Sequence, residues 1–339
     1  MFNRKSIVLI TGCAGFIGSA LSKKFLKEGY KVVGIDNVNN YYDLDLKKDR
    51  LKDISLFVSE NNLKWSFHEI SIEDKISCQK LFSKIRPQIV INLAAQAGVR
   101  YSISNPTAYF KSNMNGFFNI LELCRIYEVA HLVYASSSSI YGSSLDYPFS
   151  ENQNSNQPKS FYAATKKSNE MMAHAFSNIY KIPMTGLRYF TVYGPWGRPD
   201  MAPMIFAKNL ISKKPISVFN NGEMSRDFTF IDDIVEGTYL CSIKIPSQEI
   251  CEIEAFEKAP HKIFNIGYGK PINLLDFINM LENTFNIKAI KKYEPMQKGD
   301  VVKTYANINK LKDWINFQPK VSIDEGIKNF AKWYLDYYT

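Results

Sequence analysis

Short apolar runs alternate with helix-like segments through the first half of the chain. An unbroken apolar run is typical of a strand that is buried on both faces, as in a parallel sheet. Since helical segments separate the runs, the pattern predicts a doubly wound parallel α/β sheet with helices on both faces. The five clearest runs are 7–10, 32–35, 89–93, 132–135 and 184–187.

The pattern changes after about Gly194. Proline and glycine become frequent as far as Gly222, and 273–285 has the pattern of a helix outside any regular series of strands. We expect residues 1–194 to form one domain, which segments near 225–240 and 260–270 rejoin. Residues 195–339 should form mainly a smaller second lobe.

Three glycines, Gly12, Gly15 and Gly18, follow the first apolar run, and helix-forming residues continue to Phe25. Glycines at the end of a parallel strand let the backbone turn tightly and approach a pyrophosphate at the amino end of the next helix. Alone, this spacing fits an ordinary turn about as well as a dinucleotide site. The second run decides in favour of the site, because it ends in Asp36, where a carboxylate holds the adenosine ribose.

A carboxylate at this position accepts both ribose hydroxyls and repels a 2′-phosphate. Asn37 follows Asp36, and no arginine or lysine comes directly after it. The sequence therefore predicts a Rossmann-type domain that binds NAD rather than NADP.

Composition narrows the class of function. The chain has 339 residues, of which 45% are hydrophobic, enough for a sizeable core. Its formal net charge of +9 is spread over predicted surface helices without a basic motif interleaved with aromatics. A small anionic substrate is thus favoured over nucleic acid.

Neither a membrane span nor a cysteine framework is predicted. No apolar run approaches the ~18 residues that span a bilayer, and no signal peptide precedes the first run, so we expect a cytoplasmic protein. The five cysteines show no spacing typical of disulfides or metal sites, and we expect small buried side chains with no bound metal. They are Cys13, Cys78, Cys124, Cys241 and Cys251.

Tyr162 and Lys166 lie four positions apart in a predicted helix that starts near Phe161, and so share one face. An adjacent ammonium favours the phenolate and moves the tyrosine pKa toward the working range of a base. With 20 tyrosines in the chain, one such pair can arise by chance. The serine run 136–139 strengthens the hypothesis, since it ends a predicted parallel strand, where ligands bind in such sheets.

Together these motifs are similar to those of the extended short-chain dehydrogenase/reductase family, over nearly the whole chain. Within that family, three longer segments resemble UDP-glucuronate 4-epimerases. The resemblance implies an NAD-dependent isomerase that converts UDP-glucuronate to UDP-galacturonate through a 4-keto sugar, for surface polysaccharide synthesis. The three segments are 94–100, 191–201 and 224–233.

The resemblance also implies roles for matched residues. Tyr162 would be the catalytic base and acid, Lys166 would tune it and hold the nicotinamide ribose, and Ser137, with Ser138 beside it, would hydrogen-bond the reacting oxygen. Cofactor contacts are implied, besides Tyr162 and Lys166, at Gly12, Gly15, Phe16, Ile17, Gly18, Asp36, Asn37, Glu69, Ile70, Leu93, Ala94 and Ala95. The family usually has Asp where this chain has Glu69, whose longer side chain changes the contact with adenine.

Substrate contacts are implied at Gln96, Arg100, Ser138, Thr191, Arg198, Arg226, Asp300 and Thr304. Thr191 and Arg198 match positions near the sugar carboxylate, and Arg226 matches an arginine that binds the diphosphate. Asp300 matches a residue near the uridine ribose or its arginine, and Thr304 one that limits bulk beside the sugar. For both arginines, a structural salt bridge is the alternative interpretation.

Related dehydratases carry an Asp–Glu pair where this chain has Ser138 and Ser139, which favours an epimerase. The alternatives are a 4-epimerase of UDP-glucose, of UDP-N-acetylglucosamine or of its uronate. A more remote alternative is a non-catalytic NAD-binding regulator, a class that typically lacks the Tyr162–Lys166 pair.

A homodimer is also expected, because in this family the helix predicted at about 113–127 and the helix from Phe161 pair with their copies. Apolar residues that could line such an interface are Phe117, Phe118, Leu121, Met171, Met172 and Phe176. Each of them could equally face the protein's own sheet.

Overall fold

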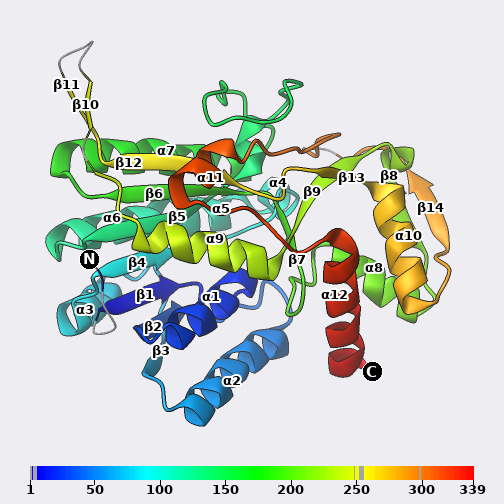
Figure 1. Cartoon of the computed structure of the whole chain (residues 1–339), viewed down its shortest axis with the longest axis horizontal. Helices are drawn as coiled ribbons and strands as arrows, with labels where there is room; N and C mark the ends of the chain where they lie inside the picture. Colours follow the sequence, from blue (N-terminus) through cyan, green and yellow to red (C-terminus); the bar gives the residue numbers. More distant parts are fainter. Residues whose placement is uncertain (1, 3–5, 248, 252–255, 298) are drawn as a thin grey trace.

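A large parallel sheet forms the centre of the protein (Figure 1). In this computed structural model, which describes residue 2 and residues 6–247, 249–251, 256–297 and 299–339, seven strands lie in the order β12-β6-β5-β4-β1-β2-β3. All neighbours pair in parallel, which confirms the predicted fold class. The strands are β1 (Ile7–Thr11), β2 (Lys31–Asp36), β3 (Trp65–Glu69), β4 (Ile89–Asn92), β5 (His131–Ser137), β6 (Met184–Tyr189) and β12 (His261–Ile266).

Alternate residues of the central strands pack into different cores. Val8 and Ile10 of β1 belong to one buried cluster and Leu9 to another, as expected for a strand that is covered on both faces. The first cluster lies under α1 (Phe16–Lys27), α2 (Leu44–Asn61) and α9 (Ile231–Ile243). The second lies under α3 (Lys75–Ile85), α6 (Phe117–Ile126) and α7 (Phe161–Tyr180).

The second lobe is built from elements that follow β6 in the chain. It contains a small sheet of β7 (Thr191–Tyr193), β9 (Ser225–Phe230) and β13 (Pro271–Asn273), and a pair of β8 (Ile216–Phe219) with β14 (Lys291–Glu294). Its helices are α8 (Ala202–Ile211), α10 (Leu274–Phe285) and α12 (Ile323–Tyr338). The hairpin of β10 (Glu249–Cys251) and β11 (Phe256–Lys258) precedes β12, and α11 (Asn309–Ile315) packs against β12.

The segments that were expected to rejoin the first domain divide between the two lobes. Strand β12 pairs with β6, and α9 packs against α1. Strand β9, by contrast, pairs with β7 and β13 in the small sheet. The chain therefore crosses between the large sheet and the small sheet more than once.

A short run of irregular helix precedes α6. It comprises α4 (Tyr101–Ser104), α5 (Pro106–Tyr109) and a π-helical segment at Phe110–Gly116, with 3-10 turns elsewhere at Ser138–Tyr141 and Asn220–Gly222. None of the helices within the described ranges is long and apolar enough to cross a bilayer. Cys13, Cys78, Cys124 and Cys241 are buried thiols, and the side chain of Cys251 lies outside the described part of the chain.

Candidate functional site

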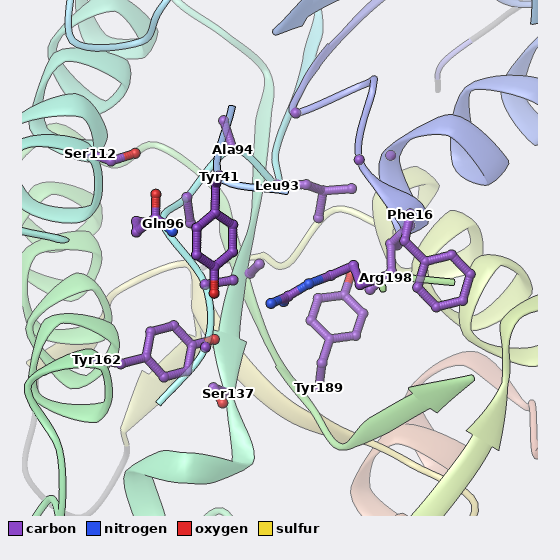
Figure 2. Close-up of a pocket in the computed structure, with 18 of the residues that line it drawn as sticks. Phe16, Tyr41, Leu93, Ala94, Gln96, Ser112, Ser137, Tyr162, Tyr189 and Arg198 are labelled. Carbon is purple, nitrogen blue, oxygen red and sulfur yellow. The ribbon is translucent and has the colours of Figure 1, made fainter. Parts of the chain in front are cut away.

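A cavity of about 360 Å³ opens where the carboxyl ends of the central strands meet the second lobe. Its wall includes the loops after β1, β2, β4 and β5, the first turn of α7, and the segment from β7 to Arg198. Figure 2 shows side chains from these distant segments pointing into one space. Open α/β sheets bind ligands at this edge.

The loop that contains Gly12, Gly15 and Gly18, the glycine loop, has almost no room for side chains. Gly12 has φ +74°, and a Cβ added there would lie 2.7 Å from the backbone nitrogen of Ala94. A Cβ added at Gly18 would overlap the carbonyl oxygen of Gly12. The loop thus brings β1, α1 and the segment after β4 into backbone contact and leaves the amino end of α1 facing the cavity, the geometry that receives a pyrophosphate.

Asp36 ends β2 at the cavity wall, as predicted. Its carboxylate accepts hydrogen bonds from the backbone N–H of Ala14 at 3.1 Å and of Val38 at 2.9 Å. Burial raises the pKa of Asp36, while these bonds and the charges of Lys47 and Arg50 lower it. The carboxylate is thus fixed beside the glycine loop, with lone pairs left for ribose hydroxyls.

Tyr162 stands in the first turn of α7, where Ser160 caps the helix by accepting from the N–H of Ala163. Burial raises its pKa, while a hydrogen bond with Ser137 and the positive charge of Arg198 lower it. Figure 2 shows Tyr162 and Ser137 side by side at the cavity. A tyrosine that shares a hydrogen bond with a serine can pass a proton to or from an oxygen held between them.

Lys166 lies one turn farther along α7 and also lines the cavity. Its Nζ donates to the carbonyl of Ala135 at 2.8 Å, and burial lowers its pKa to about 8. The groups that lower the pKa of Tyr162 here are Ser137 and Arg198. The place of Lys166 at the cavity wall suits the expected contact with a ribose.

Arg198 enters the cavity from the loop that follows β7, and Thr191 lies at the start of that strand. The Arg198 guanidinium also pairs with Asp200, through Nε at 3.1 Å and Nη2 at 2.5 Å. Asp200 in turn accepts from the Tyr41 hydroxyl at 3.2 Å. Arg198 therefore faces the cavity, as expected of a residue that binds the sugar carboxylate, and also forms a salt bridge.

Most of the predicted site residues meet at this cavity, but five do not. Glu69 is exposed at the end of the edge strand β3, and Arg100 is exposed with its guanidinium 5.2 Å from the Phe219 ring centroid. Arg226 pairs with Asp300 at 2.7 Å, and the Thr304 hydroxyl accepts from the N–H of Asp227 at 3.2 Å. The predicted residues that line the cavity are Gly12, Gly15, Phe16, Ile17, Gly18, Asp36, Asn37, Ile70, Leu93, Ala94, Ala95, Gln96, Ser137, Ser138, Tyr162, Lys166, Thr191 and Arg198.

The sequence motifs did not indicate that the segment after β2 forms part of the cavity wall. Asn39, Tyr41, Tyr42 and Lys47 line the cavity, and the Tyr41 ring packs 4.9 Å from that of Tyr101. The available signal was a pair of adjacent tyrosines, Tyr41 and Tyr42, that begins five residues after Asp36. Their contacts come from segments far along the chain, which a local pattern does not identify.

Comparison with known proteins agrees with this geometry. A family model described as the NAD dependent epimerase/dehydratase family matches residues 8–267. The chain is 48% identical to Protein CapI of Staphylococcus aureus, over 98% of this chain and 99% of that protein. It is 42% identical to a probable UDP-glucuronate 4-epimerase of Rhizobium meliloti, over 96% of each.

A solved structure extends the likeness to three dimensions. The UDP-glucuronic acid 4-epimerase of Bacillus cereus, in complex with UDP-glucuronic acid and NAD, superposes with a TM-score of 0.87 and 32% identity. The match covers 98% of this chain and all of that one.

Proposed function

This chain belongs to the NAD dependent epimerase/dehydratase family, and we propose that it converts UDP-glucuronate to UDP-galacturonate with NAD as cofactor. One observation carries the proposal: a single cavity joins the glycine loop and Asp36, the Tyr162–Ser137 pair, and the cationic Arg198. These are the groups needed to bind a dinucleotide, move a proton and receive a sugar acid. The names and ligands of the relatives support the same substrate.

The residues present fit NAD. The glycine loop offers a cradle that any side chain would fill, Asp36 offers acceptors for the adenosine ribose, and Lys166 offers a donor for the nicotinamide ribose. When bound, NAD supplies a reversible hydride acceptor for C4 of the sugar. Because the hydride returns to the same sugar, the reaction is redox-neutral.

Tyr162 moves the proton in the proposed mechanism. As a phenolate it takes the proton of the sugar 4-hydroxyl, with Ser137 hydrogen-bonded to the same oxygen. The charge of Arg198 favours the phenolate, against the effect of burial. After the 4-keto sugar has turned to present its other face, Tyr162 returns the proton and the configuration at C4 is inverted.

The 4-keto uronate is a β-keto acid, which loses carbon dioxide readily when its carboxylate carbon bond aligns with the carbonyl π system. Thr191, Ser138 and Arg198 line the cavity and can hold the carboxylate out of that alignment. Charge-assisted bonds from a guanidinium are stronger than bonds from neutral donors. Arg198 should therefore contribute most to this selectivity.

We expect Arg198→Ala and Thr191→Ala to lower catalytic efficiency with UDP-glucuronate more than with UDP-glucose. The loss for Arg198→Ala should be about tenfold or more beyond that on the neutral sugar, since a hydrogen bond to a charged group contributes ~1.5–3 kcal/mol. The measurement is kcat/KM on both substrates, with released carbon dioxide assayed in parallel.

Ser217→Ala, on the outer strand pair, is the control and should leave both activities as they are. A preference of the native protein for UDP-glucose would refute the assignment. So would equal losses on the two sugars in both variants, and the 4-epimerase of a neutral or N-acetylated UDP-sugar would then take its place.

We further propose that the protein is a homodimer, with α6 and α7 at the interface. Of the two alternatives, Phe117 and Leu121 face the protein's own sheet, since both are buried in its core. Phe118 and Met171, at 41% and 60% exposed, remain available, and the Phe118 ring packs 6.1 Å from that of Phe176. An apolar surface on two adjacent helices suits a symmetric contact.

Light scattering coupled to size exclusion should give a dimer at micromolar protein. Phe118→Glu combined with Met171→Glu should convert it to a monomer, because charges on both helices would then oppose each other across the interface. A native protein that elutes as a monomer would exclude the homodimer.

A cytoplasmic location and a role in surface polysaccharide synthesis remain predictions, best examined by fractionating cells and by deleting the gene.

A further inference from the structure

Arg50 of α2 is a fully buried arginine whose five N–H groups all have acceptors. Nε and Nη2 donate to the carbonyl of Trp196 at 3.2 and 2.6 Å, and Nη2 also donates to the carbonyl of Gly197 at 3.2 Å. Nη1 donates to the carbonyl of Ala14 at 3.0 Å and to the Tyr42 hydroxyl at 2.7 Å. One side chain thus joins the glycine loop, the loop after β2 and the loop that carries Arg198.

Within the described residues, no carboxylate lies at ion-pair distance from Arg50. Burying a charge without such a partner is costly unless hydrogen bonds satisfy the whole group. An apolar residue would fill the same core without burying a charge, and neither it nor a lysine could reach these acceptors at once. The planar fork of arginine is therefore required by the three loops and not by the core.

The loop that carries Arg198 has an unusual backbone conformation at Trp196. Trp196 has φ +64°, a conformation that bulky side chains rarely adopt and that persists only where the surroundings impose it. Its carbonyl is fixed by Arg50, and its ring packs 5.5 Å from that of Trp333 and 5.1 Å from that of Tyr337 on α12. The Tyr337 hydroxyl then donates to Asp49, the residue before Arg50.

We propose that Arg50 and the α12 residue Trp333 are positioning residues, which hold Trp196 from its two sides and thereby direct Arg198 into the cavity. Arg198 follows Trp196 by two residues, so its direction depends on the Trp196 and Gly197 peptides that Arg50 binds. Neither Arg50 nor Trp333 lines the cavity, and both act through the loop. The inference rests on the proposed role of Arg198 and extends it.

A double-mutant cycle on the NAD-loaded enzyme tests this. Arg50→Lys should lower kcat/KM for UDP-glucuronate by about 10–100-fold, the range expected when a substrate-binding group is misplaced by an ångström. With UDP-glucose the loss should be smaller. In an Arg198→Ala background, Arg50→Lys should change the substrate preference by less than about twofold, because residues that act through one another are not additive.

Arg86→Lys, on the far side of the sheet, is the matched control and should match the native enzyme on both substrates. If Arg50→Lys does not fold, Trp333→Leu carries the test, since it removes the support of the Trp196 ring outside the cavity. The same non-additivity with Arg198→Ala is expected. Bound NAD, measured after denaturation, should stay equal between the native enzyme and Trp333→Leu, since Trp333 does not line the cavity.

Equal losses on both sugars, or effects that multiply in the double variants, would overturn the inference and leave Arg50 and Trp333 with a structural role alone. A native preference for UDP-glucose would instead refute the proposed function. In that case the cycle is measured on UDP-glucose, and additivity of Arg50 with Arg198 there would still overturn the positioning role.

Discussion

Replacing Tyr162 by phenylalanine should lower epimerase turnover by at least about a hundredfold, at the lower end of the 10²–10⁴-fold typical of acid–base catalysis. The ring keeps its packing against Tyr109, 6.0 Å away, but the oxygen that accepts and returns the proton is gone. Ser137 cannot replace it, because a serine hydroxyl is too weak an acid to be ionised at neutral pH. Bound NAD should be unaffected.

The measurement is steady-state turnover of UDP-glucuronate, with NAD released by denaturation and quantified. Tyr180→Phe, at the exposed far end of the same helix, is the control and should behave as the native enzyme. A Tyr162→Phe enzyme that keeps more than about a hundredth of the native rate would exclude Tyr162 as the acid–base group.

The second large effect is expected from Gly18→Ala, which should abolish NAD binding and activity together. The added Cβ would overlap the carbonyl oxygen of Gly12 and lie 2.8 Å from its carbonyl carbon. Both atoms are backbone, so no side chain can rotate away, and either the glycine loop or α1 must move. Because the pyrophosphate is held by backbone N–H groups at that helix end, a shift of an ångström should cost about a hundredfold or more.

Ser22→Ala is the matched control on α1. It removes one hydroxyl that donates to the carbonyl of Gly18 at 2.7 Å, and it adds no atom near the loop. NAD content of the purified proteins and calorimetric titration with NAD distinguish the two variants, and thermal unfolding verifies that both fold. A folded Gly18→Ala protein that binds NAD as the native one does would contradict the cradle described for the loop.

The elements that can be predicted from this sequence are those for which a physical requirement produces a local pattern of residues. The five apolar runs became β1, β2, β4, β5 and β6, because a strand covered by helices on both faces needs consecutive apolar residues. Strand β3 gave no such run, since it lies at the sheet edge and its residues are only partly buried. The same exposure at the edge explains why Glu69 lies outside the cavity.

By itself, the sequence determined the parallel α/β fold, the glycine loop beside Asp36, and the pairing of Tyr162 with Lys166 on one helix face. Each depends on residues that are close in sequence, whose spacing fixes their relative geometry. The tertiary structure alone decided the partners of the charged side chains. It paired Arg226 with Asp300, and it buried Arg50 against carbonyls of two loops and the Tyr42 hydroxyl of a third.

The sequence alone did not identify these partners because the interactions join residues that lie far apart along the chain. Two of the carbonyls that Arg50 binds, those of Ala14 and Gly197, lie 36 and 147 positions away along the chain. No local periodicity encodes such a pair, because its two members belong to separate segments of the chain. Local pattern therefore fixed which chemistry the chain can perform, and the packing of the lobes fixed which charges take part in it.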